Sequence, residues 1–232
     1  MLALIALSAC DQTPKQHRAF VPGKDTIPVI LVAGQSNAVG QGSGQLPAVD
    51  GVSWMGISGS VYKGIGISFG QTYLKKTGRS EVIIAMCAVG GTSIAKWKPG
   101  GELFNQCTNL YQTIQHKNPR AQMAGILFWQ GEADKPGTPW AQNFIAMIRA
   151  FRASFGAEIP VIFAQIDQYG LPIDPETAYI QAQQASVYYP STTMVKTSDV
   201  QTYASDHIHI TAPGLKIVGK RMAKAYFRTI DE

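Results

Sequence analysis

The sequence predicts a three-layer α/β/α sandwich built on a central parallel sheet of about five strands. Two observations support this fold class. Short runs rich in Ile and Val alternate along the chain with segments in which apolar residues recur at helical spacing. The short runs also lack strict alternation of apolar and polar residues, which is typical of strands buried on both faces of a parallel sheet. Alternation of strand and helix implies right-handed crossovers between neighbouring parallel strands.

The elements follow in order along the chain. The expected strands are the five apolar runs Ile27–Ala33, Val82–Cys87, Ala124–Trp129, Pro160–Ile166 and Thr193–Thr197. The expected helices are the segments Ile67–Lys76, Leu103–His116, Trp140–Phe155, Glu176–Tyr188 and Pro213–Phe227. The third helix shows the pattern well, because Phe144, Ile148 and Phe151 recur at spacings of three or four. Pro213 suits the first turn of the last helix, where a missing N–H costs nothing.

Composition excludes several classes of protein. The chain has 232 residues, of which 45% are hydrophobic and 15% charged, so it has enough apolar surface to fold as one domain. The formal net charge is only +5 and no run of basic residues is present, so we do not expect a nucleic-acid-binding protein. No later stretch approaches the roughly 20 apolar residues of a membrane span. We expect a monomer.

The N-terminal residues 1–10 are apolar and end in Leu7-Ser8-Ala9-Cys10. They are too short to span a bilayer and long enough for the apolar region of a signal peptide. The last four residues resemble a bacterial lipobox, although no basic residues precede the apolar run. We therefore expect lipidation of Cys10, a tether over residues 11–26 and one domain over residues 27–232. The alternative is an apolar segment that packs on the domain.

This resemblance predicts an exported lipoprotein of the bacterial cell envelope, facing the periplasm or the exterior and touching the membrane only through its lipid. In such an oxidising compartment Cys87 and Cys107 could form a disulfide. Two buried thiols fit the sequence equally well, because the separation of the Cα atoms decides the matter.

Three loops at expected strand ends carry the candidate site, since ligands of parallel sheets bind at the carboxyl ends of the strands. The first loop reads Gly34-Gln35-Ser36-Asn37. A Ser on a tight turn can expose its hydroxyl next to its own N–H, which suits a nucleophile with a built-in oxyanion donor. A helix N-cap explains Ser36 equally well.

The second loop follows Trp129 and carries Gln130, Glu132 and Asp134. The Gln130 amide could donate to an oxyanion. The two carboxylates could act as acid and base, but we favour helix capping and hydrogen bonds within the loop as their role.

The third loop is Ser205–Thr211, which holds two of the four His residues of the chain. Asp206 and His209 are three residues apart, so a carboxylate can orient an imidazole that removes a proton from Ser36. A metal pair of His207 and His209 is the alternative, but no third ligand of suitable spacing is evident. A second alternative is that Ser205–Thr211 is a solvent-facing loop without a catalytic role. We expect neither a metal nor an organic cofactor.

Taken in order, four segments resemble the conserved blocks of the SGNH-hydrolase superfamily, over about Ile27 to Phe227. These segments are Gly34–Asn37, Gly90–Ser93, Trp129–Glu132 and Asp206–His209. The pattern is most similar to the sialate O-acetylesterase and acetyl xylan esterase branch, carbohydrate esterase family six. The resemblance implies an SGNH or flavodoxin-like fold.

The resemblance also implies a role for each site residue. Ser36 would be the nucleophile, His209 the base and Asp206 its orienting acid. The oxyanion hole would combine the N–H of Ser36 and one N–H of the Gly90-Gly91 pair with Gln130, which stands where the wider superfamily has Asn. Of the two glycines, Gly91 is preferred over Gly90. Further substrate contacts are implied for Gln35, Asn37, Trp97 and Glu132, with packing as the alternative role of Trp97.

The function expected from these residues is a serine esterase that removes O-acetyl groups from a carbohydrate, either sialic acid or a polysaccharide, through an acetyl-enzyme. Its only expected partner is the acetylated carbohydrate. An acyltransferase or a lipid or thioester hydrolase could use the same triad, and a non-catalytic carbohydrate-binding lipoprotein could share the fold.

Overall fold

The computed structural model describes residues 20–43, 47–57, 64–156, 158–169, 171–203 and 205–231. The expected lipidation site Cys10, the segment 1–10 and the tether as far as residue 19 lie outside the described residues.

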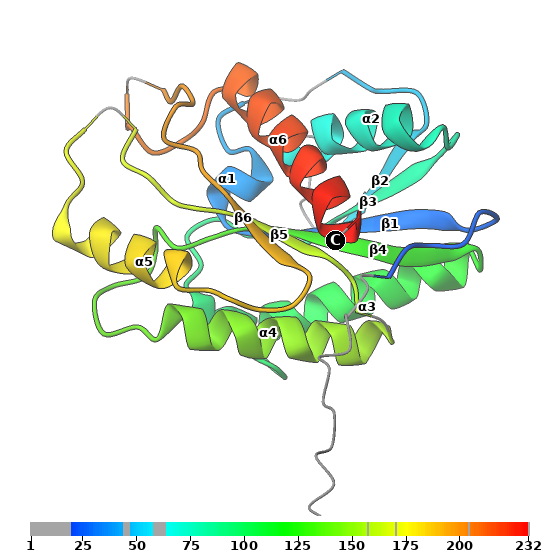
Figure 1. Ribbon diagram of the computed structural model, residues 1–232, viewed down its shortest axis with the longest axis horizontal. Coiled ribbons are helices and arrows are strands. Elements are labelled where there is room, and N and C mark those ends of the chain that lie inside the picture. Colours follow the sequence, from blue (N-terminus) through cyan, green and yellow to red (C-terminus); the bar gives the residue numbers. More distant parts are fainter. Residues whose placement is uncertain are drawn as a thin grey trace, which may run out of the picture.

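All five expected strands form, and they belong to one parallel sheet (Figure 1). The strand order is β2-β3-β1-β4-β5-β6. The strands are β1 (Ile27–Gly34), β2 (Val52–Gly56), β3 (Val82–Met86), β4 (Ala121–Trp129), β5 (Val161–Ala164) and β6 (Thr192–Val195). From β1 the chain runs to the edge strand β2, returns to β3 beside β1, and then forms β4, β5 and β6 on the other side, so the strand order switches sides at β1. A parallel sheet binds ligands at such a switch point.

The sixth strand, β2, was not expected from the sequence. It lies at the sheet edge beside β3 and buries only Val52 fully. Ser53 and Trp54 are exposed. An edge strand therefore lacks the continuous apolar run that marks the inner strands.

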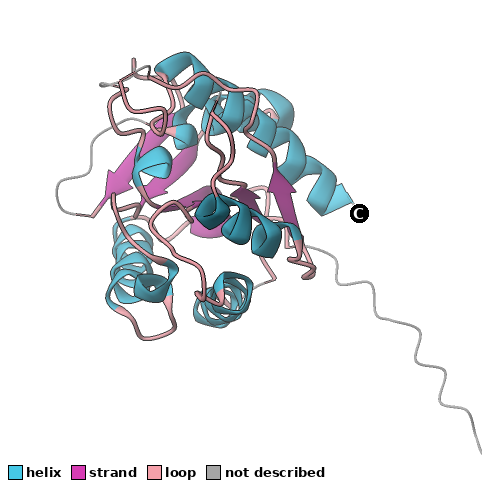
Figure 2. Cartoon of the chain, turned by 90° about the vertical axis from the view of Figure 1, so that its left-hand side faces the viewer, coloured by secondary structure: helices cyan, strands magenta, loops and turns pink. Residues whose placement is uncertain are grey.

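Helices cover both faces of the sheet, as Figures 1 and 2 show. One layer contains α2 (Ile65–Thr77) and α6 (Ala212–Asp231), and the other contains α3 (Glu102–Lys117) and α4 (Trp140–Phe155). The remaining helices are α1 (Ser36–Val39), the 3₁₀ helix η1 (Ile94–Trp97) and α5 (Pro175–Ala185). The two short ones, α1 and η1, were not anticipated. No described helix combines the length and apolar character that crossing a membrane requires.

Aromatic side chains fill the core on both sides of the sheet. Between the sheet and α4, Phe144 stacks on Trp140 with ring centroids 4.8 Å apart. On the opposite side, Phe69 of α2 meets Tyr226 of α6 edge to face at 5.6 Å. These rings are almost completely buried, and removing one such ring costs about 3–5 kcal/mol. Packing of this kind fixes the strand ends that carry the site.

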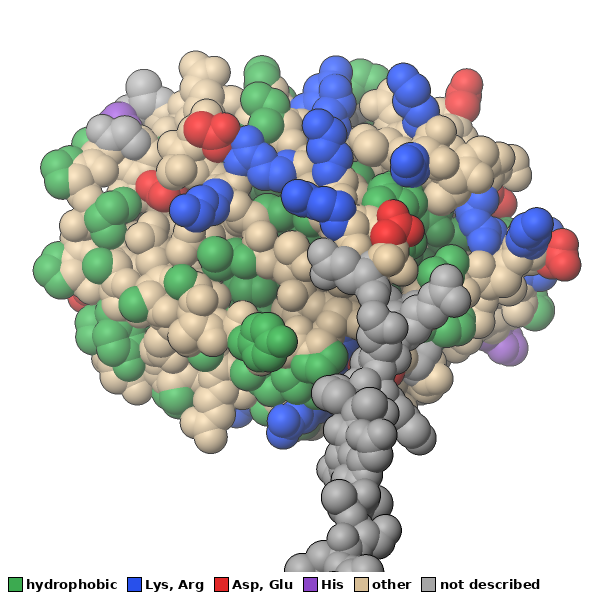
Figure 3. Space-filling view, viewed as in Figure 1, with side chains coloured by type: hydrophobic (Ala, Val, Ile, Leu, Met, Phe, Trp, Pro, Cys, Tyr) green, Lys and Arg blue, Asp and Glu red, His purple; other side chains and the backbone are tan. Residues whose placement is uncertain are grey.

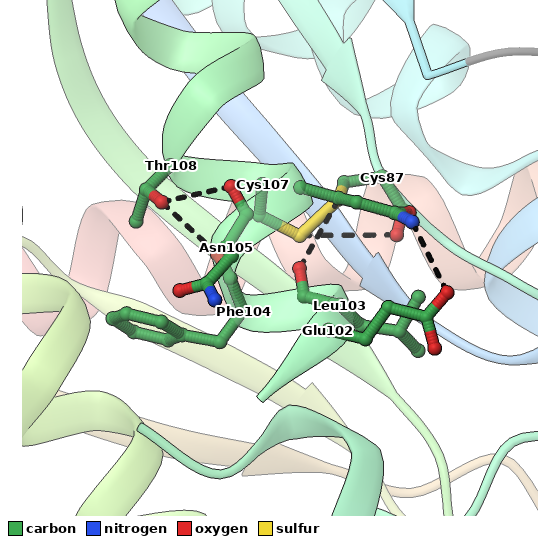
Figure 4. Close-up of a disulfide and its surroundings, with 8 residues drawn as sticks. Cys87, Glu102, Leu103, Phe104, Asn105, Cys107 and Thr108 are labelled. Carbon is green, nitrogen blue, oxygen red and sulfur yellow. Dashed lines mark hydrogen bonds between the residues drawn. A yellow bond between two sulfur atoms is a disulfide. The ribbon is translucent and has the colours of Figure 1, made fainter. Parts of the chain in front are cut away.

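A disulfide joins Cys87 to Cys107, which decides the question that the sequence left open. Cys87 directly follows β3 and Cys107 lies on α3, with their Cα atoms 5.5 Å apart (Figure 4). Both residues are fully buried. The disulfide therefore fixes the start of the loop after β3, three residues before Gly90.

Candidate active site

The turn after β1 presents Ser36 at the switch point of the sheet. Gly34 has φ = 124°, and a β-carbon there would lie 2.1 Å from the carbonyl oxygen of Trp129, so only glycine fits. The N–H of Gln35 donates to that same oxygen at 2.8 Å and fixes the turn against the end of β4. Ser36 then begins α1. The helix cap is Gln35, so the capping role considered for Ser36 does not apply.

The hydroxyl and the backbone N–H of Ser36 remain available for a ligand. Within the described part of the chain, neither its hydroxyl nor its N–H forms a hydrogen bond. Ser36 is 5% exposed, so the residue is accessible at one point while most of it is packed. A serine held in this way can meet an acyl group without first breaking an internal contact.

Gly90, rather than Gly91, lies against Ser36. A β-carbon at Gly90 would be 3.8 Å from the β-carbon of Ser36 and 3.0 Å from Gln41 Oε1. A β-carbon at Gly91 would meet nothing within 4 Å. The positive φ of Gly91, 70°, instead serves the turn of the loop. This geometry favours Gly90 over the expected Gly91 as the neighbour of Ser36.

Asp206 holds His209 by a hydrogen bond of 2.8 Å between its Oδ2 and the ring Nδ1. Its other oxygen, Oδ1, accepts the N–H groups of Ile208 and His209, both at 2.9 Å. Burial opposes the charge, but these N–H groups and the imidazole outweigh burial and lower the pKa of Asp206 to about 2. Asp206 is therefore ionised at neutral pH and directs the free Nε2 of His209 away from itself.

His207 does not share this arrangement. Its backbone is left-handed, with φ = 54°, and its N–H donates to Tyr203 O at 3.0 Å. Across the described ranges, no three His, Cys, Asp or Glu side chains are grouped as metal ligands would be.

Asn37 connects the Ser36 turn to the His209 loop. Its Nδ2 donates to the carbonyl oxygen of Ile208 at 3.1 Å, and its Oδ1 accepts the N–H of Ile210 at 3.1 Å. These two residues flank His209 on either side. The orientation of the amide follows from its partners, because an N–H can only donate and a carbonyl can only accept. One buried side chain next to Ser36 thus fixes the position of the His209 loop.

Glu132 adds a third hydrogen bond to the side chain of Asn37. Its Oε1 accepts the second N–H of Asn37 Nδ2 at 2.9 Å. Its Oε2 is buried without a hydrogen-bond partner in the described structure. Burial raises the pKa of Glu132, while the Asn37 bond and nearby His209 act in the opposite direction. Glu132 therefore places a carboxyl group near the imidazole at a cost in solvation.

Gln130 is fully buried and its amide is already engaged. Its Oε1 accepts the indole N–H of Trp140 at 2.8 Å, which fixes the orientation of the amide. Its Nε2 then faces Thr92 O at 3.0 Å and a carboxylate oxygen of Asp134. Both N–H groups have internal acceptors, which argues against the expected role of Gln130 as a free oxyanion donor.

Asp134 supports the same loop. Besides Gln130, it accepts the N–H of Ile94 at 3.0 Å, and burial raises its pKa. This is the structural role that the sequence analysis favoured for Asp134, in place of acid–base work with Glu132.

Gln35 has one end of its amide engaged. Its Oε1 accepts the N–H groups of Gly131 and Ala133 at 3.4 and 3.3 Å, besides a contact with Gln130. Because that oxygen faces two obligate donors, Nε2 must point the other way, and it has no partner within the described residues. Gln35, the residue that precedes Ser36, thus keeps a free side-chain amide N–H.

Trp97 is fully buried and packs edge to face on Phe128 with ring centroids 5.6 Å apart. A side chain without exposed surface cannot stack on a sugar, so the structure supports the packing role and argues against the expected substrate contact.

Three further residues contribute to the site and were not expected from the sequence. Gln41 lies near Gly90, Trp140 orients Gln130, and Gln184 donates to Gln130 O at 3.0 Å. Of these, only Trp140 could have been recognised from the sequence, because it carries an indole N–H at the start of an otherwise apolar helix face. A buried Trp usually needs a partner for its N–H.

Comparison with known proteins is consistent with this geometry. A family model described as carbohydrate esterase, sialic acid-specific acetylesterase, matches residues 55–228. The probable carbohydrate esterase At4g34215 of Arabidopsis thaliana is 22% identical over 170 residues, which cover 70% of this chain. The match spans 63% of that relative, less than two thirds of its length.

Solved structures share the fold. The Arabidopsis thaliana AT4G34215 protein superposes with a TM-score of 0.74 at 17% identity, covering 88% of this chain and 98% of the other. NanS gives 0.70 at 15% identity, covering 90% and 98%. XAC1771 of Xanthomonas citri, described as a novel carbohydrate acetylesterase, gives 0.65 at 19% identity, covering 88% and 56%.

Proposed function

This chain belongs to the sialic acid-specific acetylesterase family of carbohydrate esterases, and we propose that it is a serine carbohydrate O-acetylesterase that works through an acetyl-enzyme. The observation that carries the proposal is that Ser36, Asp206 and His209 are linked, with Asn37 as the connecting residue. Asp206 orients His209, and Asn37 ties both neighbours of His209 to the turn that presents Ser36.

The first half of the reaction forms the acetyl-enzyme. Ser36 Oγ attacks the acetyl carbonyl carbon while Nε2 of His209 accepts the hydroxyl proton. Asp206, ionised and bonded to Nδ1, stabilises the imidazolium. The developing oxyanion is held by the N–H groups of Ser36 and Gly90, with the free amide of Gln35 as a third donor. His209 then gives the proton to the sugar oxygen as the C–O bond breaks.

The second half releases acetate. His209 removes a proton from water, which attacks the acetyl group on Ser36, and the imidazolium returns a proton to Ser36 Oγ as the ester breaks. Every proton in this cycle passes through Nε2 of His209. Asn37 and Glu132 act through the position of that ring and do not touch the substrate in this scheme.

Acetate release from a panel of acetylated carbohydrates tests the proposal. The panel contains O-acetyl sialic acid, acetylated xylan and acetylated peptidoglycan, with p-nitrophenyl acetate as a general acetyl ester. We expect turnover of at least one acetylated carbohydrate, and none by Ser36→Ala. If p-nitrophenyl acetate is hydrolysed but no carbohydrate on a broad panel releases acetate, the chain is an esterase of another class.

We also propose export and anchoring through lipid on Cys10. The buried Cys87–Cys107 disulfide supports export, because such bonds persist in oxidising compartments. Cys10→Ser should move the protein from the membrane fraction to the soluble fraction. Equal membrane association of the two proteins would contradict the anchor.

A further inference from the structure

Helix α6 carries a row of exposed cations on one face. Lys216, Lys220, Lys224 and Arg228 follow one another at intervals of four residues, all of them exposed. Residues four apart lie on the same side of a helix, so these side chains form one row. In Figure 3, Lys and Arg side chains gather over the upper part of the molecule, where Figure 1 places α6 and α2.

Helix α2 extends this surface. Lys75 and Lys76 are exposed in its last turn, and α2 packs beside α6 (Figure 1). A groove of about 690 Å³ separates the two helices at this end. Its lining comprises Thr72, Lys75, Lys76, Lys224, Phe227, Arg228 and Asp231.

The charge of this surface is not neutralised from within. Among the described residues, none of the six cations forms an ion pair, and Asp231 is the one carboxylate that lines the groove. Six cations and one carboxylate equal the formal net charge of the whole chain, +5. Like charges four residues apart repel one another and destabilise a helix. An anionic partner would remove this cost.

The row of cations starts close to the candidate active site. Helix α6 begins at Ala212, three residues after His209, and Lys216 lies in its first turns. At a rise of 1.5 Å per residue, Arg228 lies about 18 Å further along the axis. A polymer with one unit at Ser36 could therefore continue along α6.

We propose that this α2–α6 surface, defined by the six cations, binds an anionic polysaccharide whose acetylated units are cleaved at Ser36. The inference rests on the proposed esterase function for the identity of the polymer. Flexible lysines suit a polymer with regularly spaced carboxylates, because they contact it as point charges without a fixed register. Half-buried Phe227 offers the groove an apolar face for a sugar ring.

Binding of polygalacturonate tests the proposal without relying on catalysis. We expect the wild-type protein to be retarded in gels that contain polygalacturonate, and not in gels that contain neutral xylan. In Lys220→Glu/Lys224→Glu the dissociation constant should rise by about tenfold or more, since two attractive contacts become repulsive. The control Lys117→Glu/Arg120→Glu has the same change in charge on exposed residues at the end of α3, in the opposite layer, and should bind like wild type.

Activity separates this proposal from the proposed function. All three proteins should hydrolyse p-nitrophenyl acetate equally, whereas KM for an acetylated polyuronate should rise only in Lys220→Glu/Lys224→Glu. Absence of retardation by polygalacturonate, or equal loss in both double variants, would overturn the proposed surface. Stronger binding of DNA than of polygalacturonate would assign it to nucleic acid. Inactive wild-type protein that still binds polygalacturonate would refute the esterase alone.

Discussion

Asn37→Ala should lower both stability and turnover, because this side chain makes two hydrogen bonds to the His209 loop and a third to Glu132 in the loop after β4. The two bonds to backbone partners contribute about 0.5–1.5 kcal/mol each, and the bond to Glu132 about 1.5–3 kcal/mol. Water that enters the site replaces some of the lost hydrogen bonds, so we expect the free energy of unfolding to fall by about 2–4 kcal/mol. A displacement of the imidazole by about 1 Å lowers kcat by about 10²-fold.

Urea unfolding and steady-state hydrolysis of p-nitrophenyl acetate check both effects, at a temperature where every variant is folded. Tyr111→Phe is the matched control. It leaves the buried N–H of Met123 without its 2.9 Å partner, at a cost of about 1–3 kcal/mol, but lies away from the site. The control should lose stability and keep kcat. An Asn37→Ala protein with native kcat and raised KM would show that Asn37 contacts substrate, as the family resemblance implied.

Three further predictions concern other parts of the site and the fold. His209→Ala should abolish activity and His207→Ala should retain most of it; equal loss in both, restored by zinc, would indicate a metal site instead. Burial raises the pKa of Glu132, so the native protein loses stability as pH rises and this group ionises. The melting temperature of Glu132→Gln should therefore exceed that of wild type by an amount that grows between about pH 4 and pH 8. A difference that stays constant over this range would contradict the prediction. Reducing the Cys87–Cys107 bond, which spans 20 residues, should cost about 3 kcal/mol in urea unfolding, and an unchanged midpoint would count against that value.

The parts of the fold that could be predicted are those with local signals. Inner strands such as β1 and β4 are nearly continuous apolar runs, and α4 begins and ends where its periodicity predicts. Edge strand β2 has no such run, because only Val52 is buried while Ser53 and Trp54 are exposed. The row of cations on α6 does not stand out in the sequence as a basic run, because residues four apart become neighbours only after the helix forms.

The candidate site divides in the same way. The Asp206–His209 pair was predictable, since both residues lie within one turn of chain. The engagement of Gln130 was not, because its partners Thr92 and Trp140 come from other segments. The choice between Gly90 and Gly91 needed the backbone of the loop, and the burial of Trp97 needed the packing of Phe128 against it.

Covalent labelling of Ser36 tests the central claim, that this residue is the nucleophile, most directly. Brief reaction with p-nitrophenyl acetate, acid quenching and peptide mass spectrometry should show one acetyl group on Ser36, which fluorophosphonate pretreatment prevents. Ser36→Ala should keep the native fold and take no label. Its turnover should fall by several orders of magnitude, to the residual roughly 10³–10⁴-fold over water that binding and oxyanion contacts provide. An acetyl group on another residue, or near-native turnover by Ser36→Ala, would contradict the account.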